Sequence, residues 1–152
     1  MTSPSSQQNE AAVPITLSQL KRERLRFTGF EMNRTPAGQC AADVHLEWLD
    51  GATVTGHAKG HTSPLGDFRI AAEATLRALE QFSNGALQFE LVGVKAMRAF
   101  DANVVIVAVH VIRGEGPKRL LGAHLAESDP MRSTVLAILN ATNRLLGNFI
   151  AR

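Results

Sequence analysis

The chain repeats one pattern of elements twice, and this duplication constrains its fold more than any other feature. In each half, segments with the two-residue alternation of β-strands precede a segment with the spacing of an amphipathic helix. Leu25 and Phe27 of the first half recur as Leu87 and Phe89 in the second. Helix positions recur at one constant spacing, in the pairs Ala74 and Ala137, Leu76 and Leu139, Ala78 and Ala141, and Phe82 and Leu145.

Glycines in the third strand of each half, Gly56 and Gly122, correspond as well. The segment from Gly56 to Ala74 is three residues longer than the segment from Gly122 to Ala137. One unit of about 60 residues can only half cover its own sheet, but two units related by a pseudo-twofold axis can cover each other. The sequence therefore predicts an α+β fold of duplicated βββα units, (βββα)₂, in which antiparallel sheets pack with two helices.

The predicted domain spans residues 21–152 and follows a flexible polar tail over residues 1–20. Its first repeat covers about 25–85 and its second about 87–148. Strands are expected at about 25–32, 42–48, 53–58, 87–98, Val104–Ile112 and 119–125. Hairpin turns are expected at Asp50-Gly51 and at 101–103, and a connecting loop at Gly60–Gly66. Asp67 is the expected N-cap of the first helix and Asn84-Gly85 its end. Ser128-Asp129-Pro130 is expected to open the second helix. Val104–Ile112 is almost continuously apolar, which predicts a strand covered on both faces.

Composition and charge exclude several classes of protein. Hydrophobic residues make up 45% of the chain, which is enough for a packed core. Lys and Arg number 16 against 14 Asp and Glu, so a nucleic-acid-binding surface is not expected. No apolar run is long enough to span a membrane, and residues 1–10 show no secretory signal. We therefore expect a soluble, cytoplasmic protein.

Residues for catalysis or for a cofactor do not stand out. The single cysteine, Cys40, has no recognisable base beside it, so it is interpreted as a small buried side chain. His57 and His61 would lie roughly 13 Å apart in an extended strand, too far to share a zinc ion. The sequence predicts a protein that is not an enzyme, with no catalytic residue, metal or cofactor.

Three segments carry a resemblance to a known family. The segment 139–146 contains Asn140, Asn143 and Arg144, Ser128-Asp129 opens its helix, and Leu-Gln-Phe-Glu-Leu-Val fills residues 87–92. Over roughly residues 25–146 the chain resembles the C-terminal regulatory domain of 2-isopropylmalate synthase. That resemblance implies a domain that pairs as a homodimer and binds leucine near the loops leading into its two helices. Because the chain lacks the catalytic barrel and its His-x-His metal pair, the resemblance implies a free-standing module that regulates a partner enzyme.

The two helix-entry loops supply the groups that an amino-acid-like ligand requires. Its carboxylate suits the free N–H groups of a helix N-terminus, its ammonium a carboxylate, and its side chain a small apolar pocket. The predicted ligand-binding residues are Gly60, His61, Thr62 and Ser63 in the first loop, and Ser128, Asp129 and Met131 in the second. Pro130 and Met131 stand where the family has aliphatic residues, so a ligand other than leucine stays open. The alternative role of Asp129, as the N-cap of the second helix, is the favoured one.

Two alternatives belong to other functional classes. A dimerisation or scaffold module without a ligand would account for the apolar segment Val104–Ile112. Binding of double-stranded RNA is a second alternative, because three strands followed by a helix also occur in RNA-binding folds. The nearly balanced charge argues against RNA.

Overall fold

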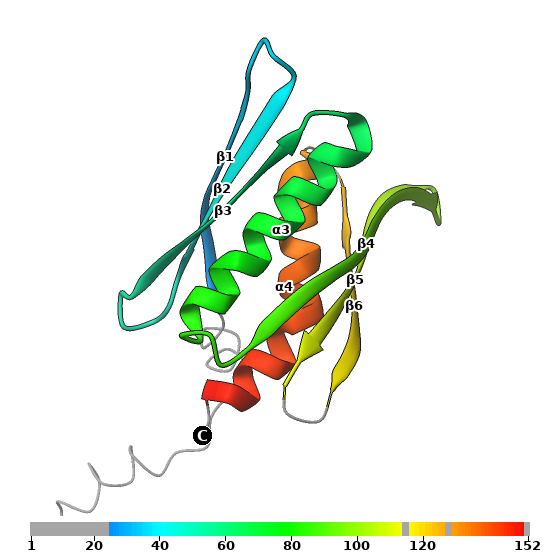
Figure 1. Cartoon of the computed structure of the whole chain (residues 1–152). Coiled ribbons are helices and arrows are strands. Elements are labelled where there is room, and N and C mark those ends of the chain that lie inside the picture. Colours follow the sequence, from blue (N-terminus) through cyan, green and yellow to red (C-terminus); the bar gives the residue numbers. More distant parts are fainter. Residues whose placement is uncertain (1–24, 114–115, 127–128, 151–152) are drawn as a thin grey trace, which may run out of the picture.

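Two units of three strands and a helix follow one another in the computed structural model, which describes residues 25–113, 116–126 and 129–150 (Figure 1). The first unit comprises β1 (Arg26–Arg34), β2 (Gln39–Glu47), β3 (Thr53–His61) and α3 (Pro64–Phe82). The second comprises β4 (Gln88–Ala99), β5 (Ala102–Ile112), β6 (Pro117–Leu125) and α4 (Pro130–Ile150). Strands β1–β3 form antiparallel sheet A, and β4–β6 form antiparallel sheet B. The predicted duplicated α+β fold is confirmed; the predicted tail over residues 1–20 lies outside the described residues.

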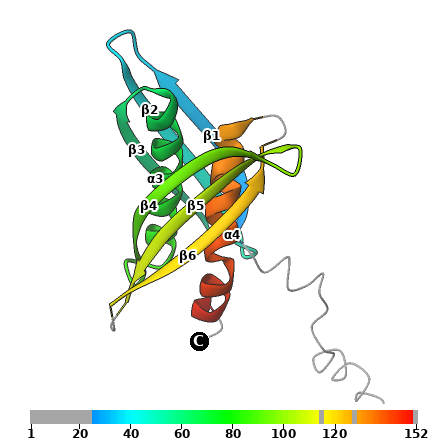
Figure 2. The same ribbon diagram turned by 90° about the vertical axis from the view of Figure 1, so that its right-hand side faces the viewer.

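The two helices lie side by side between the two sheets, and both begin at the same end of the molecule (Figures 1 and 2). Helix α3 packs on β2 and β3, and α4 packs on β5 and β6. Each helix also contacts a strand of the other unit, α3 contacting β4 and α4 contacting β1. Side chains from both units therefore form one shared hydrophobic core.

A glycine in the third strand of each unit lets a helix approach its sheet closely. A Cβ atom added at Gly56 in β3 would overlap the carbonyl oxygen of Ala74 in α3. One added at Gly122 in β6 would overlap the carbonyl oxygen of Ala137 in α4. Only glycine permits this approach. The two glycines mark equivalent positions, and their contacts confirm the predicted pairing of Ala74 with Ala137.

The sequence offset between equivalent positions of the two first strands differs from the predicted offset. Phe30 and Val94 lie two strands from these glycines in the same register row of their sheets, so they are equivalent positions. The predicted pairing of Leu25 with Leu87 is therefore wrong by two positions. The pairing of each first strand with its neighbour shifts register before this row, between Phe27 and Gly29 in β1 and between Leu91 and Gly93 in β4. The Leu-x-Phe pattern that the two segments share does not lie at equivalent positions relative to these shifts.

Helix α3 begins earlier than its sequence pattern indicates. Ser63 is the N-cap, its hydroxyl oxygen accepting a hydrogen bond from the Gly66 N–H at 2.8 Å, and Pro64 opens the helix. The prediction of Asp67 as the N-cap is wrong, because Asp67 lies within the first turn. At the other end the predicted stop is confirmed, since α3 ends at Phe82.

Two connections are shorter than predicted. Strand β3 continues to His61, so most of the predicted Gly60–Gly66 loop belongs to β3 or α3. The hairpin between β4 and β5 turns at Phe100 and Asp101, both with positive φ, one residue before the predicted turn. The ladder of backbone hydrogen bonds thus reaches further along each strand than side-chain alternation shows.

The apolar strand β5 is covered on one face. Val105, Val107, Val109 and Val111 are fully buried against the helices. Within residues 25–113, 116–126 and 129–150, no helix or strand lies over the opposite face (Figure 2). The prediction that both faces are covered is therefore wrong for this part of the chain.

Candidate functional site

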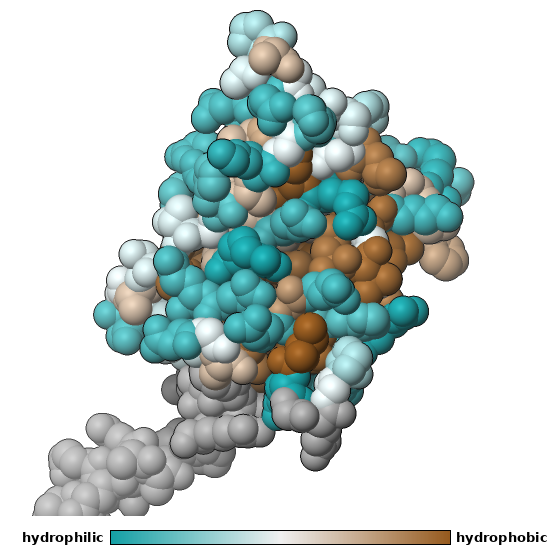
Figure 3. Space-filling view, in the orientation of Figure 1, coloured by the Kyte–Doolittle hydropathy of each residue, from teal (hydrophilic) through white to brown (hydrophobic). Residues whose placement is uncertain are grey.

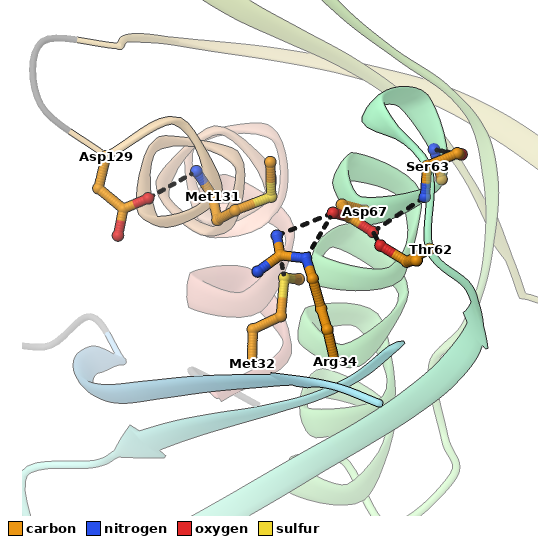
Figure 4. Close-up of polar contacts among 8 residues, drawn as sticks. Met32, Arg34, Thr62, Ser63, Asp67, Asp129 and Met131 are labelled. Atoms are coloured by element: carbon orange, nitrogen blue, oxygen red, sulfur yellow. Dashed lines mark hydrogen bonds and ion pairs between the residues drawn. The ribbon is translucent and has the colours of Figure 1, made fainter. Parts of the chain in front are cut away.

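The described residues of the two predicted ligand-binding loops lie at one end of the molecule, where α3 and α4 begin (Figure 4). Of the first-loop residues, Gly60 and His61 belong to β3 and pair with β2. The Nδ1 atom of His61 lies 3.2 Å from Nε2 of Gln39 on that strand. These two residues extend sheet A and do not form the flexible loop that was predicted.

The remaining first-loop residues hold an internal carboxylate. Arg34 at the end of β1 donates to Oδ2 of Asp67 from Nη2 at 2.8 Å and from Nε at 3.0 Å (Figure 4). The Thr62 hydroxyl donates to Oδ1 at 2.8 Å, and the Ser63 N–H donates at 3.3 Å. Asp67 is 7% exposed. Thr62 and Ser63 are thus engaged by the chain's own acid.

This network keeps Asp67 ionised. Burial by itself would raise the pKa of the Asp67 carboxyl, but the hydrogen bonds from Arg34, Thr62 and Ser63 outweigh it and hold that pKa below its usual value. The same hydrogen bond with Asp67 raises the pKa of Arg34 further. The first unit therefore carries a closed arginine–carboxylate pair at the start of its helix.

In the second loop, Asp129 acts as the N-cap of α4. Its Oδ1 atom accepts from the Met131 N–H at 3.0 Å, and its carbonyl accepts from the Ser133 N–H at 3.0 Å. The capping role considered for Asp129 in the sequence is confirmed. Ser128 lies outside the described residues. The side chain and the carbonyl of Asp129 thus bond to N–H groups in the first turn of α4. The ligand-binding role of this loop stays a prediction.

The second unit has an arginine at the position of Arg34. Arg98 lies four residues beyond Val94 in β4, as Arg34 lies four beyond Phe30 in β1, and neither interval contains a register shift. Both arginines therefore occupy the same place in their sheets, on the face toward the helices. Unlike Arg34, Arg98 belongs to none of the ion pairs among the described residues.

The acid that pairs with Arg34 has no counterpart at the same place in α4. Helix α3 begins ten residues before Ala74, but α4 begins seven residues before Ala137. Helix α4 thus lacks one turn that α3 has, which is the three-residue difference between the two repeats. Pro130, the first residue of α4, stands at the position of Asp67.

A cleft of about 360 Å³ opens where that turn is missing. It is bounded by the hairpin of β4 and β5, the first turns of α3 and the start of α4. We call it the Arg98 cleft; its lining residues are Phe68, Ala96, Met97, Arg98, Asn103, Val104, Ala126 and Pro130. Six of them are apolar, and Arg98 and Asn103 supply the polar groups. Small-molecule sites have this composition and a similar size.

The electrostatics of this end of the molecule favour an anion. The positive ends of both helix dipoles lie here, because α3 and α4 begin side by side. Asp67 and Asp129 already interact with these helix starts, so Arg98 supplies the charge that remains for a ligand. Arg98 is exposed, and the one hydrogen bond that its side chain makes within the described chain is a 3.5 Å contact from Nη2 to the Asp101 carbonyl oxygen. A guanidinium group offers paired donors that match a carboxylate. The arrangement can therefore bind a small carboxylate.

The described residues do not favour metal binding or a reactive cysteine. No group of three or more His, Cys, Asp or Glu side chains in the described ranges could hold a metal ion. Cys40 is fully buried, and burial raises the pKa of its thiol, which disfavours the nucleophilic thiolate. No helix within the described parts of the chain is long and apolar enough to cross a membrane.

No protein-family model matches the chain, and no curated protein matches it significantly. The candidate site is accordingly defined by its own residues.

Sequence reasoning missed the residues that line the cleft. Arg98, Asn103 and Phe68 come from a strand end, a hairpin and a helix that meet only in the fold. A signal was present, since Arg34 and Arg98 coincide when the repeats are aligned on Phe30 and Val94. The pairing of Leu25 with Leu87 placed the two arginines out of step and so hid this correspondence.

Proposed function

We propose that the chain is a non-catalytic regulatory module that binds a small carboxylic acid in the Arg98 cleft and acts on a partner enzyme. One observation carries the proposal. In the first unit Arg34 forms an ion pair with Asp67, whereas in the second unit the equivalent Arg98 faces a cleft. A ligand carboxylate would take the place that the Asp67 carboxylate takes in the first unit. The second unit would thus form, with the ligand, the arginine–carboxylate pair that the first unit forms between two of its own side chains.

The cleft lining indicates the class of ligand. Phe68, Ala96 and Pro130 contribute apolar surface, which favours an apolar side chain on the acid. Asn103 carries an amide beside Arg98 that can bond an amino, keto or hydroxyl group. We therefore propose an apolar amino acid, or a branched 2-keto or 2-hydroxy acid.

The resemblance to the regulatory domain of 2-isopropylmalate synthase supports the same proposal. That family binds its feedback amino acid near the two helix starts, and the Arg98 cleft lies at the helix starts of this chain. The segment 139–146, on which the resemblance partly rests, belongs to α4. Regulation of a partner enzyme follows from this resemblance.

Thermal-shift screening followed by calorimetric titration tests the proposal. The twenty amino acids and branched 2-keto and 2-hydroxy acids are compared with their amides, which lack the carboxylate charge. We expect at least one apolar acid to raise the melting temperature, because a ligand that binds only the folded state stabilises it. The matching amide should not. If no acid raises it at millimolar concentration, the proposal is wrong.

Replacing Arg98 with glutamine should weaken binding of that acid at least tenfold, or about 1.4 kcal/mol. The reason is the loss of the charge-assisted hydrogen bonds to the carboxylate. Lys59→Gln is the matched control, because Lys59 is an exposed positive charge on the outer face of sheet A and is not among the residues that line the cleft. Equal affinity of Arg98→Gln and the wild type, measured by calorimetry, would contradict the role of Arg98.

A further inference from the structure

The outer faces of the two sheets, which point away from the helices, differ in chemistry. On sheet A this face is polar and internally bonded. His45 lies 3.1 Å from Glu31 and 2.9 Å from the Thr55 hydroxyl, and His57 lies 2.7 Å from Asp43. The polar side chains of such a face bond to one another and to water, so the face needs no cover.

The outer face of sheet B is apolar except for Lys95 on its edge strand β4, although it is the same face of the repeated unit. Its central three register rows contain Met97, Val104, Leu125, Lys95, Ile106, Ala123, Gly93, Ala108 and Leu121. Leu121 is 68% exposed and Leu125 is 47% exposed. Figure 2 shows this face toward the viewer, and in Figure 3 hydrophobic residues gather on the side formed by sheet B. A contiguous apolar sheet face of this kind marks an interaction surface.

A charged row borders these apolar rows. Glu90 of β4, His110 of β5 and Arg119 of β6 are register partners at one end of the face. Glu90 lies 3.6 Å from His110, and Nε of Arg119 lies 3.4 Å from the same ring. The row therefore carries a negative group at the β4 edge and a positive group at the β6 edge.

We infer that a second copy of this chain covers the outer face of sheet B, so that two B sheets pack face to face. Stacked sheets pack with their strands nearly aligned, about 30° apart. With a twofold axis along β5, β4 of one subunit lies over β6 of the other, and every register row meets itself. The apolar residues of each row then meet apolar residues, Lys95 lies at the edge of the interface over β6 of the partner subunit, and Glu90 faces Arg119 of the partner subunit twice. The face is self-complementary in hydropathy and in charge, which a symmetric dimer requires. The inference does not depend on ligand binding.

Leu121→Glu should weaken the dimer at least tenfold, as measured by sedimentation of the full chain over a range of concentrations. A carboxylate on this face would have to be buried in the apolar interface. Thr55→Glu is the matched control, because Thr55 precedes Gly56 as Leu121 precedes Gly122, and it should leave the association unchanged. A chain that is monomeric throughout would overturn the inference, as would a Leu121→Glu variant that dimerises like the wild type. The first result would mean that another segment of the chain, or a different partner, covers the face.

Charge reversal in the charged row tests the arrangement without adding a charge to the three central rows, so it also serves if Leu121→Glu fails to fold. Glu90→Arg alone and Arg119→Glu alone should each weaken the dimer, because each brings like charges together across the interface. The double variant should restore association close to that of the wild type. A double variant that associates as weakly as either single variant would overturn the proposed packing.

Discussion

Replacing Gly56 with alanine should lower the free energy of unfolding by about 3 kcal/mol or more. The added Cβ would overlap the Ala74 carbonyl oxygen and lie 2.8 Å from the Ala78 Cβ, so backbone would have to move against backbone. Helix α3 could then no longer rest on β3, and the shared core would open. Urea unfolding followed by circular dichroism measures the change.

Gly60→Ala is the matched control, because Gly60 lies on the same strand and the same face. A Cβ there would meet only the Ile70 side chain, at 3.4 Å, which is ordinary contact. We expect a change within about 1 kcal/mol. Equal effects of the two substitutions would contradict the role given to Gly56.

Replacing Asp67 with asparagine should cost about 2 kcal/mol at neutral pH. The change leaves Arg34 without its ionised partner, although Arg34 is half exposed and water recovers part of the loss. The folded pKa of Asp67 is lowered, so its contribution is present above the unfolded pKa of about 3.9 and is lost as the pH falls through the folded value. The stability difference between wild type and variant should therefore shrink at acidic pH.

Unfolding measured across a pH series checks this expectation, and Asp129→Asn is its control. Asparagine caps a helix about as well as aspartate, so that variant should differ little from the wild type. A difference between wild type and Asp67→Asn that is constant down to pH 2 would contradict the ion pair.

The order and type of the elements could be predicted from the sequence, because alternation, helical spacing and the Asn84-Gly85 end are local signals. The start of α3 could not be placed correctly from Asp67. Ser63-Pro64 and Asp67 are both typical of a helix start, and the partner that decides between them, Arg34, lies 33 residues away. A local pattern does not contain that contact.

The apolar segment of β5 shows a second limit. Its nearly continuous apolar sequence predicts two covered faces, but it carries no information on what covers each face. The helices cover one, and the other is the outer face of sheet B. The cleft was hidden for a related reason, since the missing turn of α4 becomes a cavity only beside the hairpin that carries Arg98.

The most direct test is the affinity of the Pro130→Asp variant for the carboxylic acid that binds the wild-type chain. Aspartate at this position would restore the acid that Asp67 provides in the first unit, and acidic residues are favourable in a first helical turn. We expect the variant to lose binding, because its own carboxylate would engage Arg98, while Pro130→Asn retains it. Undiminished binding by Pro130→Asp would contradict the claim that the ligand replaces a carboxylate of the chain.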